Sequence, residues 1–256
     1  MIIKFLKFVA RFFIKSNGFD PRSLINLRFL PKYLKDEKSW IKQGGKIDKR
    51  SIILNDFESE AGTTQGEYFH QDLLVAKFIF DRNPKRHIDV GSRIDGFVAH
   101  VASYREIEIL DIRPLHKIQH QNISFIQADL MNVQDLQKTD SLSCLHAIEH
   151  FGLGRYKDPI DIYGHIKGIN NLISILEKGG IFYISFPIGK KNEVYFNEQR
   201  IFHPKSILEI TNIKNLMQLI RFDYVDIYGD LHQNCDLENI SYEYISCGIY
   251  TFKRIH

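Results

Sequence analysis

The chain has 256 residues, a length that fits one α/β domain with an N-terminal addition better than two full domains. Hydrophobic residues make up 44% and charged residues 25%, as in ordinary globular proteins, and a net charge of only +3 does not mark a nucleic-acid binder. Cys144, Cys235 and Cys247 have neither metal-ligand nor Cys-x-x-Cys spacing, so we expect free thiols in a reducing, cytoplasmic compartment.

Residues 1–16 predict a basic amphipathic helix, in which apolar residues alternate with Lys4, Lys7, Arg11 and Lys15. Such a helix can lie in a membrane interface, or it can pack its apolar side on the domain, and both interpretations stay open. Because no run of about 18 apolar residues is present, a membrane contact would be peripheral, on the inner face. A cleaved secretory signal is not expected.

A second basic helix follows the turn at residues 17–21 and extends to about Gln43, where two glycines interrupt it. The pattern then predicts, in order, a short strand, a loop and a helix, at residues 51–54, 62–66 and 67–80. We therefore divide the chain into a helical extension, residues 1–50, and an α/β domain, residues 51–256.

From residue 87 onward strand-like and helix-like segments alternate, which predicts a parallel sheet with crossover helices. The predicted strands are residues 87–90, 107–110, 123–126, 141–146 and 181–186. The predicted helices are residues 96–103, 161–176 and 204–211. Lys178-Gly179-Gly180 predicts a glycine cap that closes the second of these helices.

The end of the chain breaks this alternation, because residues 216–228 and 242–253 are both β-like with no helix between them. We expect a hairpin-like pair whose last strand enters the sheet antiparallel. Five parallel strands followed by a C-terminal antiparallel β-pair predict a seven-stranded, mostly parallel, doubly wound α/β sheet. This is the Rossmann-like fold of class I methyltransferases, whereas a dinucleotide-binding fold would continue to alternate.

The loops after the strands carry glycine and acidic residues, at the edge where parallel sheets bind ligands. Gly91 permits a tight turn after the first strand, and Gly96 lets the next helix begin against the sheet. Asp111, after the second strand, is placed to accept hydrogen bonds from both hydroxyls of a ribose. Asp129 is placed to accept a hydrogen bond from an adenine amino group. Alternatively, both aspartates cap turns. The spacing is not G-x-G-x-x-G, which favours S-adenosylmethionine over NAD.

Arg93 and Asp95 stand where the common methyltransferase pattern has further glycines. Arg93 can face the carboxylate of the methionine part or that of Asp95, or it can obstruct the pocket. The predicted cofactor-binding residues come from these loops and are Asp89, Gly91, Ser92, Arg93, Asp95, Gly96, Asp111, Arg113, Asp129 and Leu130.

The segment after the fourth strand, residues 146–156, combines two histidines, an acid, an arginine and a tyrosine. A general base that takes a proton from a sugar hydroxyl is favoured over a metal site, and we predict no metal. The predicted catalytic residues are His150, His146, Glu149 and His70. Segments 68–72 and 200–204 either close over the same site or serve ordinary packing. The predicted substrate contacts are Tyr68, Asp72, Arg155, Tyr156, Arg200 and His203.

Several longer motifs resemble domain-of-unknown-function family 268. They are GEYFHQDL at 66–73, DVGSRIDGF at 89–97, DIRPL at 111–115, DLMN at 129–132, IEHFGLGRYKD at 148–158, FPIG at 186–189 and FNEQRIFHP at 196–204. This resemblance, over roughly residues 65–207, implies similarity to class I S-adenosylmethionine-dependent methyltransferases. The family shares Arg93 and Asp95, which implies a modified cofactor site or another ligand. Its bacterial members resemble parts of surface-polysaccharide clusters.

The resemblance thus implies a methyltransferase that acts on a sugar or nucleotide-sugar in surface-polysaccharide biosynthesis. Two alternatives stay open: a non-methylating sugar-modifying enzyme on the same fold, and a non-catalytic glycan-assembly scaffold. Methylation of nucleic acid is disfavoured, because the core domain has no basic stripe studded with aromatic residues. The expected partners are a small-molecule or glycan substrate and no nucleic acid.

Overall fold

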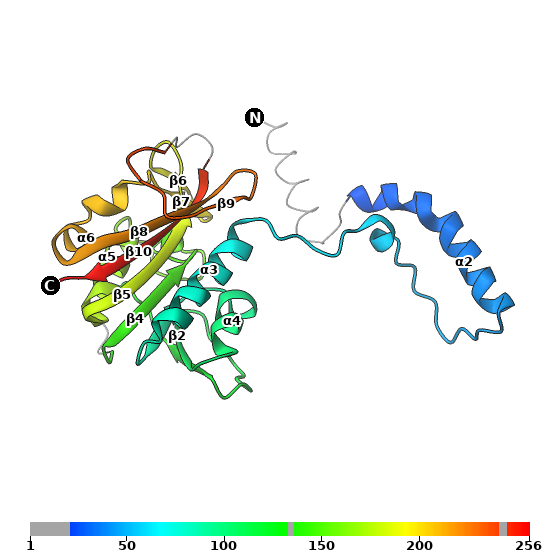
Figure 1. Ribbon diagram of the computed structural model, residues 1–256, viewed down its shortest axis with the longest axis horizontal. Coiled ribbons are helices and arrows are strands. Elements are labelled where there is room, and N and C mark those ends of the chain that lie inside the picture. Colours follow the sequence, from blue (N-terminus) through cyan, green and yellow to red (C-terminus); the bar gives the residue numbers. More distant parts are fainter. Residues whose placement is uncertain (1–20, 133–135, 241–244) are drawn as a thin grey trace. The chain divides into compact units, whose positions relative to one another are not determined.

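A computed structural model describes residues 21–132, 136–240 and 245–256 (Figure 1). The chain divides into two compact units, Met1–Thr63 and Thr64–His256. The helix predicted at residues 1–16 lies outside the described residues. In the described part of the chain, none of the helices has the length and apolar composition needed to cross a bilayer.

The described part of the first unit contains α2 (Leu30–Lys42), with the 3₁₀ helices η1 (Pro21–Phe29) before it and η2 (Asn55–Glu58) after it. The predicted basic helix is therefore confirmed. The strand predicted at residues 51–54 is wrong, since this segment pairs with no strand among the described residues. The side chains of Ile52 and Ile53 are 63% and 61% exposed, so this apolar run has no sheet face to join.

The second unit is built on one large sheet, whose strands are β1 (His87–Val90), β2 (Ile107–Asp111), β3 (Ile123–Gln127), β4 (Thr139–Leu145), β5 (Leu176–Pro187), β8 (Met217–Asp226), β9 (Leu231–His232) and β10 (Ile245–Arg254). Their order across the sheet is β3-β2-β1-β4-β5-β10-β8-β9. The strands from β3 to β5 are parallel, and β10 is antiparallel to both of its neighbours. The predicted mostly parallel sheet with an antiparallel last strand is confirmed, and the short β9 is added at its edge.

Helices cover both faces of this sheet, as a doubly wound fold requires (Figure 1). The helices of one face are α3 (Glu67–Arg82), the π-helical turn η3 (Ile94–Val98) and α4 (Ala99–Ala102). The helices of the other face are α5 (Gly164–Ile175), η5 (Ser206–Glu209) and α6 (Thr211–Leu216). Successive strand residues alternate between the two faces. In this way Ile107 and Ile109 enter one core, and Leu110 enters the other.

The glycine cap predicted after the second crossover helix is wrong. The helix α5 ends at Ile175, and Leu176 already has extended backbone as the first residue of β5. Leu176 is fully buried in the core and pairs with Thr139 of β4, so packing and pairing take the chain into the sheet before it reaches Gly179. A separate antiparallel pair, β6 (Glu193–Tyr195) with β7 (Gln199–Ile201), was not predicted, because three-residue strands leave no clear pattern.

Candidate active site

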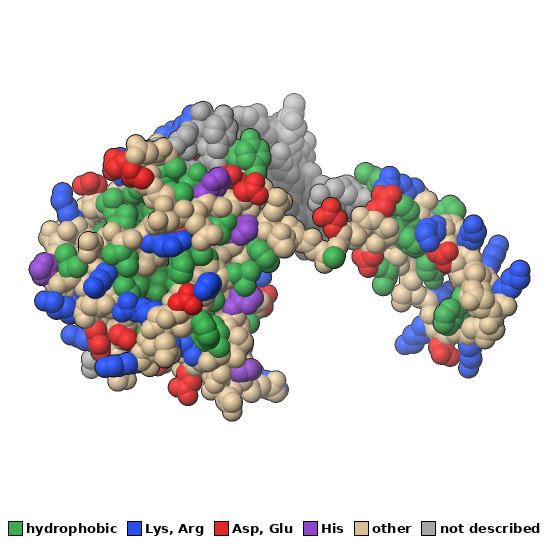
Figure 2. Space-filling view, in the orientation of Figure 1, with side chains coloured by type: hydrophobic (Ala, Val, Ile, Leu, Met, Phe, Trp, Pro, Cys, Tyr) green, Lys and Arg blue, Asp and Glu red, His purple; other side chains and the backbone are tan. Residues whose placement is uncertain are grey.

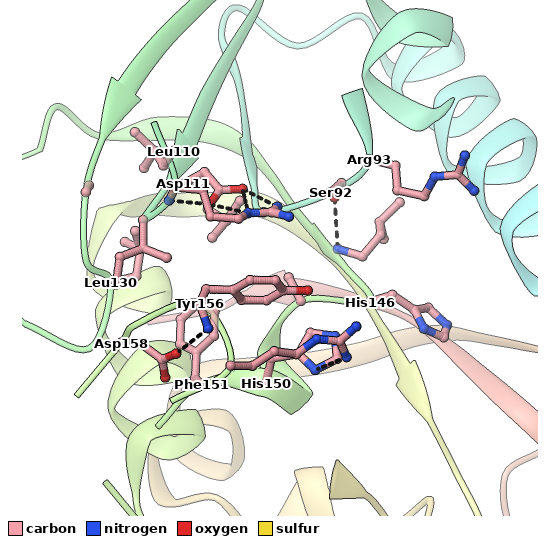
Figure 3. Close-up of a pocket in the computed structure, with 18 of the residues that line it drawn as sticks. Ser92, Arg93, Leu110, Asp111, Leu130, His146, His150, Phe151, Tyr156 and Asp158 are labelled. Atoms are coloured by element: carbon pink, nitrogen blue, oxygen red, sulfur yellow. Dashed lines mark hydrogen bonds and ion pairs between the residues drawn. The ribbon is translucent and has the colours of Figure 1, made fainter. Parts of the chain in front are cut away.

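A pocket of about 600 Å³ lies beyond the carboxyl ends of β1, β2, β3 and β4 (Figure 3). Many predicted site residues line it, namely Tyr68, Gly91, Ser92, Arg93, Asp95, Asp111, Arg113, Asp129, Leu130, His146, His150, Arg155 and Tyr156. The other predicted site residues do not line it, namely His70, Asp72, Asp89, Gly96, Glu149, Arg200 and His203. The fold thus brings the residues after four strands into one cavity.

The turn after β1 depends on glycine at position 91. Gly91 has φ +69°, and a Cβ placed there would lie 2.8 Å from Cβ of Ala147. Its amide donates to the Leu110 carbonyl at 3.0 Å, which holds the turn beside the end of β2. A side chain would therefore be strained and would also push the loop after β4 away.

The buried carboxylate of Asp89 holds this turn in place by hydrogen bonds and does not line the pocket. It accepts hydrogen bonds from the Ser92 amide at 3.1 Å, the Ser92 hydroxyl at 2.6 Å and the Ser143 hydroxyl at 2.5 Å. The Ser92 hydroxyl in turn accepts from the Leu145 amide at 3.1 Å. This network ties the turn after β1 to β4. Burial raises the pKa of Asp89 to about 6, although the hydrogen bonds favour its charged form.

This raised pKa gives a prediction about stability. Because folded Asp89 binds its proton more tightly than unfolded Asp89, its contribution to the free energy of unfolding falls as the pH rises from about 4 to about 6. We expect Asp89→Asn to remove up to about 3 kcal/mol of this decrease. Urea unfolding followed by circular dichroism at several pH values would measure it. Equal pH dependence in the variant and the parent protein would contradict the prediction.

Asp111 lines the pocket with its carboxylate already paired. The Arg113 guanidinium donates to Oδ1 through Nε at 3.0 Å and to Oδ2 through Nη2 at 2.5 Å, and the Arg113 amide donates to Oδ1 at 2.8 Å. The hydrogen bonds of its side chain to Asp111 raise the pKa of Arg113. The same guanidinium lies over the Tyr156 ring, 4.6 Å from its centre. A ribose at Asp111 would therefore have to share the carboxylate with Arg113 or displace it.

Asp129 also lines the pocket, and its side chain caps the turn that follows β3. Its carboxylate accepts from the Met131 amide at 2.9 Å and from the Asn132 side-chain amide at 2.5 Å. The geometry is that of the turn cap that the sequence left as the alternative. Leu130 is buried beside it and adds an apolar surface to the same wall of the pocket.

Arg93 leaves the pocket open. Its guanidinium contacts Asp95 at 3.3 Å and lies over the Tyr68 ring, 5.1 Å from its centre. Figure 3 shows this side chain pointing away from Asp111 and Tyr156. Hydrogen bonding to Arg93 lowers the pKa of Asp95, so the pair stays charged at the rim.

The two histidines after β4 share one buried acid. Glu149 is 1% exposed, and its Oε1 lies 3.4 Å from Nδ1 of His146 and 3.6 Å from Nε2 of His150. Neither carboxylate oxygen makes a hydrogen bond within the described chain. Nε2 of His146 lies 3.2 Å from Sγ of Cys247. Among the described residues, no group of three or more His, Cys, Asp or Glu could hold a metal ion.

The two histidines differ in protonation. Burial lowers the pKa of His150, and the nearby Glu149 only partly opposes this, so His150 is neutral at pH 7. Its Nδ1 lies 2.7 Å from the Glu198 carbonyl, which places the proton on Nδ1. Burial also works to lower the pKa of His146, but Cys247 and Glu149 outweigh it, and the pKa rises well above its ordinary value. His150 therefore has an unprotonated ring nitrogen, Nε2, at pH 7.

Asp158 organises the loop that carries these groups, a role that our sequence reasoning missed. Its carboxylate accepts from three backbone amides, those of Gly152 at 2.8 Å, Gly154 at 3.2 Å and Tyr156 at 3.1 Å. The signal was present as an acid four residues after a Gly-x-Gly, a spacing suited to amide capping. The loop therefore holds Tyr156 and Arg155 against the pocket.

The β6–β7 hairpin closes the opposite wall, and its Glu198 and Gln199 line the pocket. The Glu198 carbonyl accepts from Arg155 at 2.9 Å as well as from His150. The guanidinium of buried Arg200 donates to backbone carbonyls, at 2.6 Å to Phe151 and at 3.3 Å to Glu149. Arg200 thus fastens the hairpin to the loop after β4 and does not reach the pocket.

Three further predicted residues lie around the site and not in it. Asp72 is buried against Gly96, where an added Cβ would come 2.5 Å from its Oδ2, and burial raises the pKa of Asp72 to about 6. His70 packs edge-on against Phe69 in the first turn of α3. The His203 amide donates to Asn192 at 2.6 Å, at the end of the hairpin region.

Comparison with known proteins agrees with this architecture. The family model described as Caenorhabditis protein of unknown function, DUF268, matches residues 102–245. No curated protein sequence matches the chain. The N-methyltransferase NodS from Bradyrhizobium japonicum WM9, in complex with S-adenosyl-L-homocysteine, is similar with a TM-score of 0.50 and 10% identity, over 75% of this chain and 89% of that chain.

Two other solved structures are similar to the same degree. The Burkholderia thailandensis 1,6-didemethyltoxoflavin-N1-methyltransferase has a TM-score of 0.50 and 9% identity, over 92% of this chain and 89% of that chain. The 4+2 cyclase SpnF has a TM-score of 0.51 and 12% identity, over 76% and 86%. The fold is therefore that of class I S-adenosylmethionine-dependent methyltransferases, as predicted.

Proposed function

The chain belongs to the DUF268 family, and from this premise and its pocket we propose that it transfers a methyl group from S-adenosylmethionine to a hydroxyl of a small acceptor. The observation that carries the proposal is the common wall formed by the Gly91 turn, Asp111 and Asp129 around one cavity. Its volume of about 600 Å³ is in the range of pockets that enclose a small molecule.

The residues present fit the cofactor. The Gly91 turn, which has no room for a Cβ, would lie against the methionine part, and Asp111 and Asp129 would hold the nucleoside. When bound, S-adenosylmethionine supplies a methyl group on a positively charged sulfur. The protein's part is then to align the acceptor oxygen with that methyl group and to exclude water.

His150 is the proposed base. The acceptor hydroxyl would give its proton to Nε2 of His150, which carries no proton in the neutral ring. Glu149, 3.6 Å from the same nitrogen, and the Glu198 carbonyl at Nδ1 stabilise the resulting imidazolium. Tyr68, Arg155 and Tyr156 line the same pocket and would position the acceptor.

The proposed acceptor is a sugar or nucleotide-sugar, as the resemblance of the sequence implies, and the proposed setting is surface-polysaccharide biosynthesis in the cytoplasm. Contact with the inner membrane face through residues 1–16 belongs to the same proposal. Ribose-like hydroxyls suit a pocket that mixes acids, arginines and an aromatic ring.

Titration of the protein with S-adenosylhomocysteine tests the cofactor. We expect binding by isothermal titration calorimetry, and we expect Asp111→Asn to weaken it about 10- to 100-fold, because charged hydrogen bonds to the ribose are lost. Asp81→Asn is the matched control, since Asp81 is exposed and pairs only with Lys77 among the contacts described. Equal affinities of the two variants would contradict the proposal.

A second candidate, a non-methylating sugar-modifying enzyme, is favoured by the pairing of Asp111 with Arg113. A solved structure of the same fold is that of a cyclase. The Arg113→Ala variant separates the two functions. If Asp111 holds a ribose, the variant frees the Asp111 carboxylate from Arg113, and the affinity for S-adenosylhomocysteine stays unchanged or rises. If Arg113 binds the anionic ligand of a non-methylating enzyme, the parent protein does not bind S-adenosylhomocysteine, and the variant loses binding of a UDP-sugar.

A further inference from the structure

The helix α2 is amphipathic, yet none of its residues is buried in the described part of the chain. Its apolar residues recur at spacings of three, four and seven, which places them on one side of the helix. They are Leu30, Tyr33, Leu34, Trp40 and Ile41. The side chains of Leu34, Trp40 and Ile41 are 46%, 57% and 52% exposed. Because a helix of 13 residues is marginal in water without packing, we expect this apolar side to bind a surface.

Both acids of α2 are paired with cations of the same unit. Lys32 donates to Asp36 at 2.6 Å within the helix. Glu37 lies on the apolar side, where its Oε1 accepts from Nε of Arg50 at 2.6 Å, and its side chain is only 15% exposed. The negative charges of the helix are therefore compensated locally, and its remaining charges are positive.

The remaining lysines form a row along the helix. Lys35, Lys38 and Lys42 are exposed, and they take part in none of the ion pairs of the described chain. Their spacing of three and four residues puts them on one side, and Lys38 is the helical neighbour of both Leu34 and Ile41. Figure 2 shows basic and hydrophobic side chains next to one another over the unit that contains α2. A row of cations thus borders the apolar side.

Trp40 has a feature that suits the boundary between lipid headgroups and acyl chains. Its Nε1 donates to the Lys46 carbonyl at 3.2 Å, so the exposed ring carries no unsatisfied N–H group into an apolar environment. Gly45 makes room for the ring, because a Cβ at this position would lie 2.3 Å from Nε1. Tryptophan on the apolar side and lysine beside it are typical of helices that lie in a membrane interface.

We propose that α2 binds the surface of a membrane that contains anionic lipids, with its apolar side toward the acyl chains and its lysine row at the phosphates. A second copy of the chain suits the apolar side less well, because a symmetric contact brings two lysine rows together. Anionic headgroups instead complement the row. This inference goes beyond the proposed methyl transfer, since no residue of α2 lines the candidate active site.

The fluorescence of Trp40 tests the proposal in the full chain. Trp40 is the only tryptophan, so its emission reports on α2 and not on residues 1–16. The protein is titrated with vesicles of equal parts phosphatidylcholine and phosphatidylglycerol, and with vesicles of phosphatidylcholine alone. We expect the emission to shift to shorter wavelength with the anionic vesicles, which should bind at least about tenfold more tightly than the neutral ones. Bromine on the acyl chains should quench the emission.

A triple variant tests the lysine row. Lys35→Gln, Lys38→Gln and Lys42→Gln together should weaken binding to the anionic vesicles about 100-fold, because each lysine near the surface adds to the attraction. Glutamine has a helix propensity close to that of lysine, so α2 should remain folded. The matched control removes the same net charge from the second unit and should keep the affinity of the parent protein. It replaces the exposed lysines Lys117, Lys138 and Lys178 by glutamine.

Ile41→Asp tests the apolar side and should weaken vesicle binding about tenfold or more, because apolar burial is lost. Its matched control is Ile227→Asp, at a position 54% exposed in the second unit. The proposal is overturned if the anionic vesicles leave the emission of Trp40 unchanged, whether or not the protein sediments with them. It is also overturned if the emission shifts without vesicles as the protein concentration rises, which assigns the face to a second copy, or if either variant binds as its control does. S-adenosylhomocysteine binding is measured separately, so the two proposals fail separately.

Discussion

Replacing Gly152 by alanine is expected to destabilise the protein by about 3 kcal/mol or more. Gly152 has φ +76°, and a Cβ at this position would lie 2.1 Å from the backbone carbonyl oxygen of Asp161. Gly164, at the start of α5, packs directly against it, so the backbone has no direction in which to relax. The loss is measured as the free energy of unfolding in urea.

Gly179→Ala is the matched control for this prediction. Gly179 has a similar φ, +80°, but nothing lies within 4 Å of the position of its Cβ. The Gly179→Ala variant therefore shows the loss in free energy of unfolding that left-handed backbone alone causes, about 1 kcal/mol. If the two variants lose the same stability, the collision with Asp161 has no energetic weight and our account of the loop is wrong.

His150→Gln is expected to lower the rate of methyl transfer about 10²- to 10⁴-fold, the range over which a positioned base contributes. Glutamine retains a hydrogen-bonding group for Glu198 but cannot take the hydroxyl proton. Affinity for S-adenosylhomocysteine should stay within about twofold, since a base that acts only on the acceptor adds little to cofactor binding. The assay is transfer of labelled methyl from S-adenosylmethionine to a panel of sugars and UDP-sugars.

The pH profile adds a second readout. Because the pKa of His150 lies below its ordinary 6.5, the rate should be flat around pH 7 and fall only as the pH drops below that value. His100→Gln, an exposed histidine on α4, should retain the full rate and profile. A His150→Gln variant as active as His100→Gln would remove His150 from the mechanism.

Most strands of the parallel part of the sheet were predictable, because strands that are buried on both faces read as apolar runs that end at glycine or acidic residues. Leu110-Asp111 is such an end, and it lies at the end of β2. Where two signals compete, sequence reasoning failed. Lys178-Gly179-Gly180 has the composition of a helix cap, yet burial of Leu176 and its pairing with Thr139 decide the boundary. Tertiary contacts outweighed local propensity there.

The candidate site was predictable only as a set of loops. Topology alone brings the ends of β1, β2 and β4 together, so residues such as Gly91 and His146 could be placed beside one cavity. The partner of each side chain could not be predicted, because partners lie far apart in the sequence. Arg200 contacts Phe151, 49 residues away, and Glu198 contacts His150, 48 residues away. Both contacts depend on a hairpin with no sequence signature.

That hairpin forms a wall of the candidate active site through Glu198 and Gln199, and its Val194 and Ile201 line a second cavity, of about 500 Å³. A molecule that displaces the hairpin in one cavity therefore changes the free energy of binding in the other. By thermodynamic linkage, the factor by which an occupant of the second cavity changes cofactor affinity equals the factor by which the cofactor changes affinity for that occupant. Two titrations, each run with the other compound saturating, would give the same ratio.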